Sequence, residues 1–234
     1  MKAVFQREFR SYMHGVLGPG LIALLMLAVG LLSGVYQILL ASPRFETVLN
    51  LMQLLLLFVM PLLAMRAAGG QKRGSAQRFL FSLPLPTHAI VLGQYLASLA
   101  VFGVACGIIA LYLPVLSLLG LSSLGSAYTA LLGFLLLGAV LLALGTLLSS
   151  LTESPFVALL LSMGVTVLLY VMGVLSEGGA LGSTLSAVMS AISPFSGFTR
   201  LCNGVFDLTV VLFDVLLSAA ALALSCLAVE RRLR

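Results

Sequence analysis

The sequence predicts an all-α integral membrane protein with six transmembrane helices. Hydrophobic residues make up 61% of its 234 positions and charged residues only 8%, whereas roughly 25% of a soluble domain is charged. Because lipid cannot satisfy an open backbone, each crossing needs about 20 apolar residues in a helix. Six segments of the chain meet that requirement. The composition therefore excludes a soluble globular protein.

The basic residues predict how these helices are oriented. Ten of the twelve lysines and arginines fall in three short stretches, Lys2 to Arg10, Arg66 to Arg78 and Arg231 to Arg234. Short loops rich in Lys and Arg stay on the cytoplasmic side, and only Arg44 and Arg200 lie in the other polar breaks. We therefore expect both termini and one central loop in the cytoplasm. No nucleic acid is expected as a partner, because the cations flank apolar spans and line no exposed face with aromatic neighbours.

Residues 1–14 are predicted to form an amphipathic helix in the cytoplasmic interface. On a helix, Phe5 and Phe9 lie near one face and Arg7 and Arg10 near the other. The alternative is a plain N-terminal extension of the first span. The apolar run that follows lacks a small-residue cleavage site and exceeds signal-peptide length, so we expect it to remain as a span.

The six spans are predicted at residues 16–40, 48–68, 88–118, 128–151, 155–174 and 208–229. Pro61 is expected to kink the second span. The third is long for one crossing, so a tilt, a kink at Pro114 or a cytoplasmic extension is implied. The link Thr152-Glu153-Ser154 is so short that spans four and five should form an antiparallel hairpin. Between the last two spans, the apolar piece from Leu185 to Ile192 is too short to cross, and it should re-enter the membrane or lie in its interface.

The most informative local feature is the polar segment between the second and third spans. Gln71, Lys72 and Arg73 are followed by Arg78 and Phe79. A short helix here would lie amphipathically against the membrane and project its cations into the cytoplasm. A solvated basic loop is the alternative. The position of the segment, just ahead of a rigid Pro-Leu-Pro step, favours the functional interpretation.

No catalytic, metal-binding or cofactor-binding motif is found in the sequence. His14 and His88 lie at the ends of spans, without a neighbouring Cys, Asp or Glu in ligand or general-base spacing. The three cysteines are far apart and form no CxxC pair. Ser75 stands where a phosphate-binding loop would need Lys. We therefore expect a chain that is not an enzyme and binds no cofactor directly.

Asp214 is the one carboxyl group expected deep inside a span. It lies in the sixth span, roughly 10 Å below its start at about 1.5 Å per residue. An intramembrane carboxylate is a functional hypothesis by default, because its burial is costly. The alternative is a protonated or hydrogen-bonded acid packed against Ser or Thr of a neighbouring helix.

Several stretches together carry a family resemblance through their order and spacing. They are Met1 to Tyr12, Pro61 to Arg66, Ile90 to Gly93, Ser150 to Glu153, Ser193 to Phe198 and Gly204 to Leu208. With these stretches the chain resembles the type-2 permeases of ATP-binding-cassette (ABC) exporters. The resemblance runs nearly end to end. It is strongest to the branch related to gliding-motility and nitrous-oxide-reductase maturation permeases.

The resemblance implies a non-catalytic permease subunit in a bacterial-type inner membrane. It would couple ATP hydrolysis by a separate ABC-type ATPase, which holds the ATP and Mg²⁺, to movement of a substrate. Residues 2–12 match the family's elbow helix, and residues 70–82 match the coupling helix that enters the ATPase. Glu153 would face the same ATPase. Where this family commonly has an acidic pair, Gly70 and Gln71 stand, which suggests an ATPase groove that is more acidic or neutral.

The family also implies a dimer, with a second permease copy or a homologous permease, surrounded by lipid. Gly30/Gly34 and Gly103/Gly107 are GxxxG pairs, and Gly138 is a further small residue in a span. Such glycines allow helices to approach closely. Packing within one subunit explains them as well as dimerisation does.

Two other function classes compete with this one. An ion-coupled secondary transporter, or another multi-pass protein working without an ATPase, should show paired intramembrane charges or inverted repeats. A membrane-embedded enzyme should show an intramembrane His with a Ser or Glu partner. Asp214 is the only deep charge in the sequence and no repeat is seen, which disfavours the first class. The sequence shows no intramembrane His with such a partner, which disfavours the second.

Overall fold

The computed structural model describes residues 2–39, 44–69, 87–118, 123–152, 154–177, 183–204 and 206–233. Within these residues the chain is helical and contains no β-strand. In chain order, the helices are α1 (Lys2–His14), α2 (Leu17–Ser33), the π-helical turn η1 (Gly34–Leu39), α3 (Phe45–Gly69), α5 (Thr87–Leu118), α6 (Leu124–Leu151), α7 (Pro155–Glu177), α8 (Ser183–Ile192), α9 (Pro194–Cys202) and α10 (Leu208–Leu233).

Six of these helices are long and apolar enough to cross a membrane, namely α2, α3, α5, α6, α7 and α10. An all-α, multi-pass membrane architecture is therefore confirmed. The fourth of these helices begins at Leu124, ahead of residue 128: Ser123 is extended (φ −79°, ψ 123°), and Leu124 to Ala127 contain no proline that would stop the helix from starting there. The last continues to Leu233, through the basic cluster that was expected to follow it.

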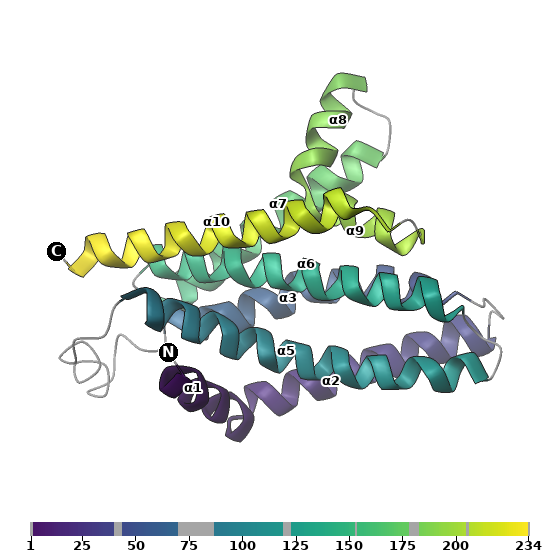
Figure 1. Cartoon of the computed structure of the whole chain (residues 1–234), viewed down its shortest axis with the longest axis horizontal. Helices are drawn as coiled ribbons and strands as arrows, with labels where there is room; N and C mark the ends of the chain where they lie inside the picture. The colour runs from purple at the N-terminus through teal and green to yellow at the C-terminus, as the bar shows by residue number, and fades with distance from the viewer. Residues whose placement is uncertain are drawn as a thin grey trace.

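Figure 1 shows α3 and α6 in the middle of the bundle, with α2 and α5 on one side and α7 and α10 on the other. Helix α1 and the C-terminal end of α10 lie at the same end. The short helices α8 and α9 connect α7 to α10, and α8 projects from the side of the bundle (Figure 1). Neither short helix is among those long enough to span a membrane.

Helix α6 is central because its glycines let neighbouring helices approach from three directions. A Cβ atom at Gly138 would lie 2.2 Å from the Phe102 ring of α5, and one at Gly145 would lie 2.3 Å from Ala64 of α3. At Gly133, a Cβ would crowd Leu201 and Phe198 of α9. Since lipid provides no hydrophobic drive between helices, such close approach is a main source of packing energy in a membrane.

An aromatic row passes through this centre. The rings of Phe102 and Phe134 lie 5.7 Å apart, and those of Phe134 and Phe198 lie 6.2 Å apart. All three side chains are fully buried. The row ties α5, α6 and α9 together.

Two prolines inside spans leave backbone carbonyls without a helical partner, and side chains of neighbouring helices supply one. Proline has no N–H, so Pro61 frees the carbonyl of Leu57, and Pro114 frees that of Ala110. The Thr166 hydroxyl of α7 lies 3.4 Å from the Leu57 oxygen and shares its single proton between that oxygen and the Met163 carbonyl of its own helix, at 2.9 Å. The Tyr128 hydroxyl of α6 donates to the Ala110 oxygen at 3.2 Å. Membrane proteins tolerate proline in spans when neighbours satisfy the freed groups in this way.

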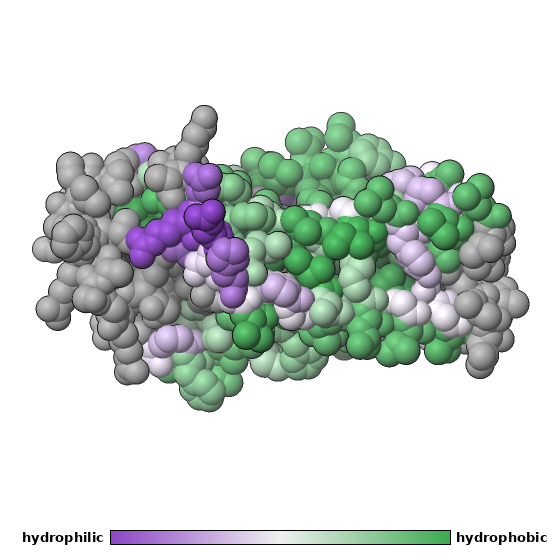
Figure 2. Space-filling view, turned by 90° about the horizontal axis from the view of Figure 1, so that it is seen from below, coloured by the Kyte–Doolittle hydropathy of each residue, from purple (hydrophilic) through white to green (hydrophobic). Residues whose placement is uncertain are grey.

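The outside of the bundle is apolar along most of its length. Figure 2 shows the face that carries α1 and α2, with hydrophilic residues gathered near the α1 end and hydrophobic residues over most of the remainder. Large apolar side chains such as Leu31, Leu111, Leu168 and Leu216 are exposed. This surface suits contact with lipid or with other membrane helices.

Candidate functional sites

Helix α1 packs mainly on α5, and also on α2, and it reaches α3 through Tyr12. Val4 contacts the α5 backbone, where a Cβ at Gly93 would lie 3.0 Å from the Val4 side chain. Tyr12 is almost fully buried, and its hydroxyl donates to the carbonyl of Leu63 at 3.3 Å. The apolar face that was expected to meet the membrane interface is thus partly covered by α5.

The aromatic and the basic residues singled out on α1 from the sequence differ in burial, as their polarity predicts. The Phe5 and Phe9 rings stack 5.9 Å apart and are half-buried against the core. Arg7 and Arg10 are both exposed. An anchored helix with outward cations is therefore present at the N-terminus.

The residues predicted to contact an ATPase lie outside the described residues. They are Gln71, Lys72, Arg73, Arg78, Phe79 and Glu153. The helix ends that flank them are described: α3 ends at Gly69, α5 begins at Thr87, α6 ends at Leu151 and α7 begins at Pro155. In Figure 1 these ends lie at the same end of the bundle as α1.

Asp214 lies on the inward face of α10 and is only 2% exposed. Helix α10 packs mainly on α6, and also on α5 and α9. The Asp214 Oδ1 atom has no hydrogen-bond partner in the described part of the chain. The Ser or Thr partner expected from the hydrogen-bonded alternative is therefore not found at this oxygen. A buried polar atom without a partner is rare enough in native proteins to need an explanation.

Three further buried polar atoms, on α10 and on the two helices α5 and α6 against which it packs, also lack hydrogen-bond partners among the described residues. They were not predicted from the sequence. They are the Gln94 side-chain nitrogen on α5, the Ser149 hydroxyl on α6 and the Ser225 hydroxyl on α10. These three helices pack against one another. A single Ser or Gln in a long apolar run gives no signal of the direction in which it points, which is why such residues were missed.

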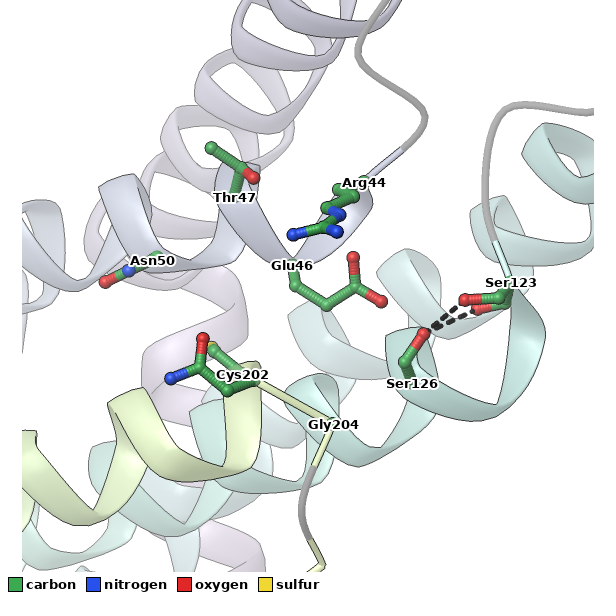
Figure 3. A pocket seen from close by; sticks show the side chains of 9 residues that line it. Arg44, Glu46, Thr47, Asn50, Ser123, Ser126, Cys202 and Gly204 are labelled. Carbon is green, nitrogen blue, oxygen red and sulfur yellow. Dashed lines mark hydrogen bonds between the residues drawn. The ribbon is translucent and has the colours of Figure 1, made fainter.

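A polar pocket of about 330 Å³ lies at the end of the bundle opposite α1. It is lined by Arg44, Glu46, Thr47 and Asn50 at the start of α3, Ser123 and Ser126 at the start of α6, and Cys202, Asn203 and Gly204 at the end of α9. Figure 3 shows the Glu46 carboxylate between Arg44 and the hydrogen-bonded pair of Ser123 and Ser126. Gly204 has a φ of +80° and closes the turn after α9.

The pocket was also missed in the sequence, although each of its parts is visible there. Polar residues crowd the first turns of the second span, but the partners come from two distant breaks in the chain. Burial, and to a lesser degree the charge of Glu46, raises the pKa of the Cys202 thiol to about 12. Cys202 is therefore an uncharged thiol at neutral pH.

The described residues offer no cluster for a metal ion. They contain no group of three or more His, Cys, Asp or Glu side chains that could hold one. His14 and His88 are exposed at helix ends. Cys106, Cys202 and Cys226 are free thiols.

No family model matches the chain, and no curated protein is significantly similar to it.

Proposed function

We propose that the chain is the membrane-spanning permease subunit of an ATP-driven ABC exporter. The observation that carries the proposal is the place of the helix ends that flank the basic segment of residues 71–80. The segment follows α3 and precedes α5, whose adjoining ends lie at the same end of the bundle as α1 and the C-terminal end of α10 (Figure 1). A cytoplasmic ATPase would meet this end of the bundle, because the basic stretches that favour the cytoplasmic side belong to this end.

Helix α1 would serve as the elbow helix that links the ATPase-facing segment to the spans. It contacts α3 through Tyr12 and Leu63, and α5 through Val4 and Gly93. Leu63 and Gly93 belong to α3 and α5, the two helices that flank the basic segment in the chain. A displacement of that segment would therefore move α1, α3 and α5 together.

In this mechanism, the ATPase supplies the energy and the permease supplies a two-state path. Gln71, Lys72, Arg73, Arg78 and Phe79 would form the coupling helix in a groove of the ATPase, and Glu153 would add a second contact. ATP-driven closure of two ATPase subunits would tilt the spans between two arrangements. The cationic coupling segment suits a groove that carries acidic or neutral groups.

A second permease copy or a homologous permease would complete the path, within surrounding lipid. The glycines of the two GxxxG pairs support this part of the proposal. No atom of another described segment lies within 4 Å of the place a Cβ would take at Gly30, Gly34, Gly103 or Gly107. At Gly138, in contrast, the Phe102 ring of the same chain occupies the space that a Cβ would take. The two pairs are thus open to a helix from outside the subunit.

The proposal is tested by purifying the tagged chain from its native membrane. A stoichiometric subunit with a Walker motif should accompany it, and ATP hydrolysis by the complex should fall when residues 71–80 are scrambled. A variant with Arg231, Arg232 and Arg234 changed to Gln is the matched control, because it removes cations of the same sign from the C-terminus. Recovery of the chain alone, with transport driven by a proton gradient, would overturn the proposal.

An ion-coupled secondary transporter is the alternative that one observation favours. Asp214 is a buried carboxyl group with an oxygen that has no partner among the described residues. Such a group can carry a proton or a cation through a membrane. The alternative requires transport to depend on this carboxyl group.

A further inference from the structure

The polar pocket lies where two membrane spans begin. The span of α3 starts at Phe45 and that of α6 at Leu124. Pocket residues Arg44, Glu46 and Ser126 lie within one turn of these starts. Because the polar headgroups of a bilayer lie just outside its hydrocarbon core, the pocket is at the depth of lipid headgroups.

The charges of the pocket are of opposite sign and remain available. Within the described residues, no ion pair joins the Arg44 guanidinium to the Glu46 carboxylate, although both line the pocket. Arginine binds phosphate through several N–H donors. Both α3 and α6 direct their N-terminal ends toward the pocket, which also favours an anion. A carboxylate such as Glu46 accepts hydrogen bonds from an ammonium group.

The neutral lining narrows the ligand further. Among the residues that the structure describes, it consists of hydroxyl and amide groups with one thiol and Gly204, and none of these lining residues is aromatic. Quaternary ammonium groups are usually held by aromatic rings, so a primary ammonium fits this lining better. The volume of about 330 Å³ is at the small end of the range for ligand sites. The pocket therefore suits one small headgroup-sized molecule.

We infer that this pocket binds the phosphoethanolamine zwitterion, with its phosphate at Arg44 and its ammonium at Glu46. The zwitterion has two sources, the headgroup of a phosphatidylethanolamine lipid and free phosphoethanolamine. The inference does not depend on an ATPase partner, so it stands or falls separately from the exporter proposal.

The test titrates the purified full chain in detergent with short-chain phosphatidylethanolamine, phosphatidylglycerol and phosphatidylcholine, and with free phosphoethanolamine. Native mass spectrometry counts bound ligand, and the shift of the thermal unfolding midpoint follows its affinity. Arg44→Gln and Glu46→Gln should each weaken binding of the zwitterion by at least about fivefold, the loss of one good polar contact. Arg200→Gln is the matched control, because it removes an exposed cation of α9 outside the pocket.

The outcomes divide cleanly. Binding of the phosphatidylethanolamine alone, of the free molecule alone or of both supports the site and identifies the source. Phosphatidylglycerol lacks the ammonium group. Its affinity for the wild type should therefore be no higher than the affinity of phosphatidylethanolamine for the Glu46→Gln variant. Arg44→Lys keeps the charge and should retain part of the affinity, which separates lost binding from lost folding. Unchanged affinity in both Gln variants, equal binding of all three lipids, or no binding at all overturns the inference.

Discussion

The centre and the rim of this bundle are built from similarly apolar helices that are buried to very different degrees. In the apolar stretch of 18 residues that marks each span, 61% of the residues of α6 and 56% of those of α3 are buried inside the chain. For α7 and α10 the buried share is 22% each. Leucine, valine and alanine dominate all four helices. Apolar character therefore does not decide which helix lies inside.

The small residues of the inner helices account for the difference. Gly138 and Gly145 of α6 accept Phe102 and Ala64 from its neighbours, whereas Gly164 of α7 has nothing within 4 Å of the place its Cβ would take. In lipid an exposed leucine costs little, so helices pack inside only where their surfaces fit closely. Substitutions should therefore cost more stability at the closely packed centre than at the rim, and mutations can test this difference.

The largest contrast is expected from removing one phenylalanine ring at the centre and one at the rim. Phe134 of α6 is 0% exposed and Phe156 of α7 is 67% exposed. Phe134→Ala leaves a cavity between Phe102 and Phe198 and should cost roughly 2 to 4 kcal/mol of unfolding free energy, because the cavity term persists in a membrane. Phe156→Ala should cost less than about 0.5 kcal/mol. Reversible unfolding in mixed micelles measures both, and equal losses would show that centre and rim do not differ in packing.

The same contrast explains what the sequence could predict. The six helices that can cross a membrane are visible as long apolar runs, and α1 as an alternation of apolar and basic residues before Gly15. The neighbours of each helix are not visible, because spans such as α5 and α6 are apolar on every face and carry no stripe that marks an interior. The same holds for the candidate sites. The sequence shows Asp214 as a lone charge deep in a span, but whether its oxygen finds a hydrogen-bond partner depends on which side chains of α6 lie opposite it.

The polar pocket could not be predicted for a related reason. Arg44, Ser123 and Asn203 belong to three breaks that are distant in the chain, and each break alone looks like an ordinary interfacial loop. Only the packing of α3, α6 and α9 brings them together. The partners of the two proline-freed carbonyls were hidden in the same way, although the prolines themselves were obvious.

An intermediate effect is expected at Asp214, a polar group on the inward face of a rim helix. Asp214→Leu removes a buried carboxyl oxygen that has no partner among the described residues, and it should raise the unfolding free energy by about 1 to 2 kcal/mol. Asp214→Asn keeps the shape and should leave ATP-driven transport intact if the exporter proposal holds. Ser218→Ala, on the same helix and hydrogen-bonded within it, is the control. Loss of transport in Asp214→Asn at unchanged stability would instead give the carboxyl group a functional role and favour the ion-coupled alternative.

The smallest effect is expected where the rim helix α7 supports the inner helix α3 at its proline. Thr166→Val removes the hydroxyl whose proton is shared between the Leu57 carbonyl freed by Pro61, at 3.4 Å, and the Met163 carbonyl of its own helix, at 2.9 Å. It should cost about 0.6 to 1 kcal/mol. Ser162→Ala is the control, since the one acceptor of this buried hydroxyl among the described residues is the Leu159 carbonyl of its own helix.

A double-mutant cycle makes the cause specific. Pro61→Ala restores a backbone N–H, so the Leu57 carbonyl regains a helical partner and no longer needs the threonine. In that background Thr166→Val should cost less than about half of its effect in the wild type. An undiminished cost would mean that the Thr166 hydroxyl acts through the Met163 carbonyl of its own helix and not through Leu57. In that case the polar link between α7 and α3 would contribute nothing, and this contact between rim and centre would depend on shape alone.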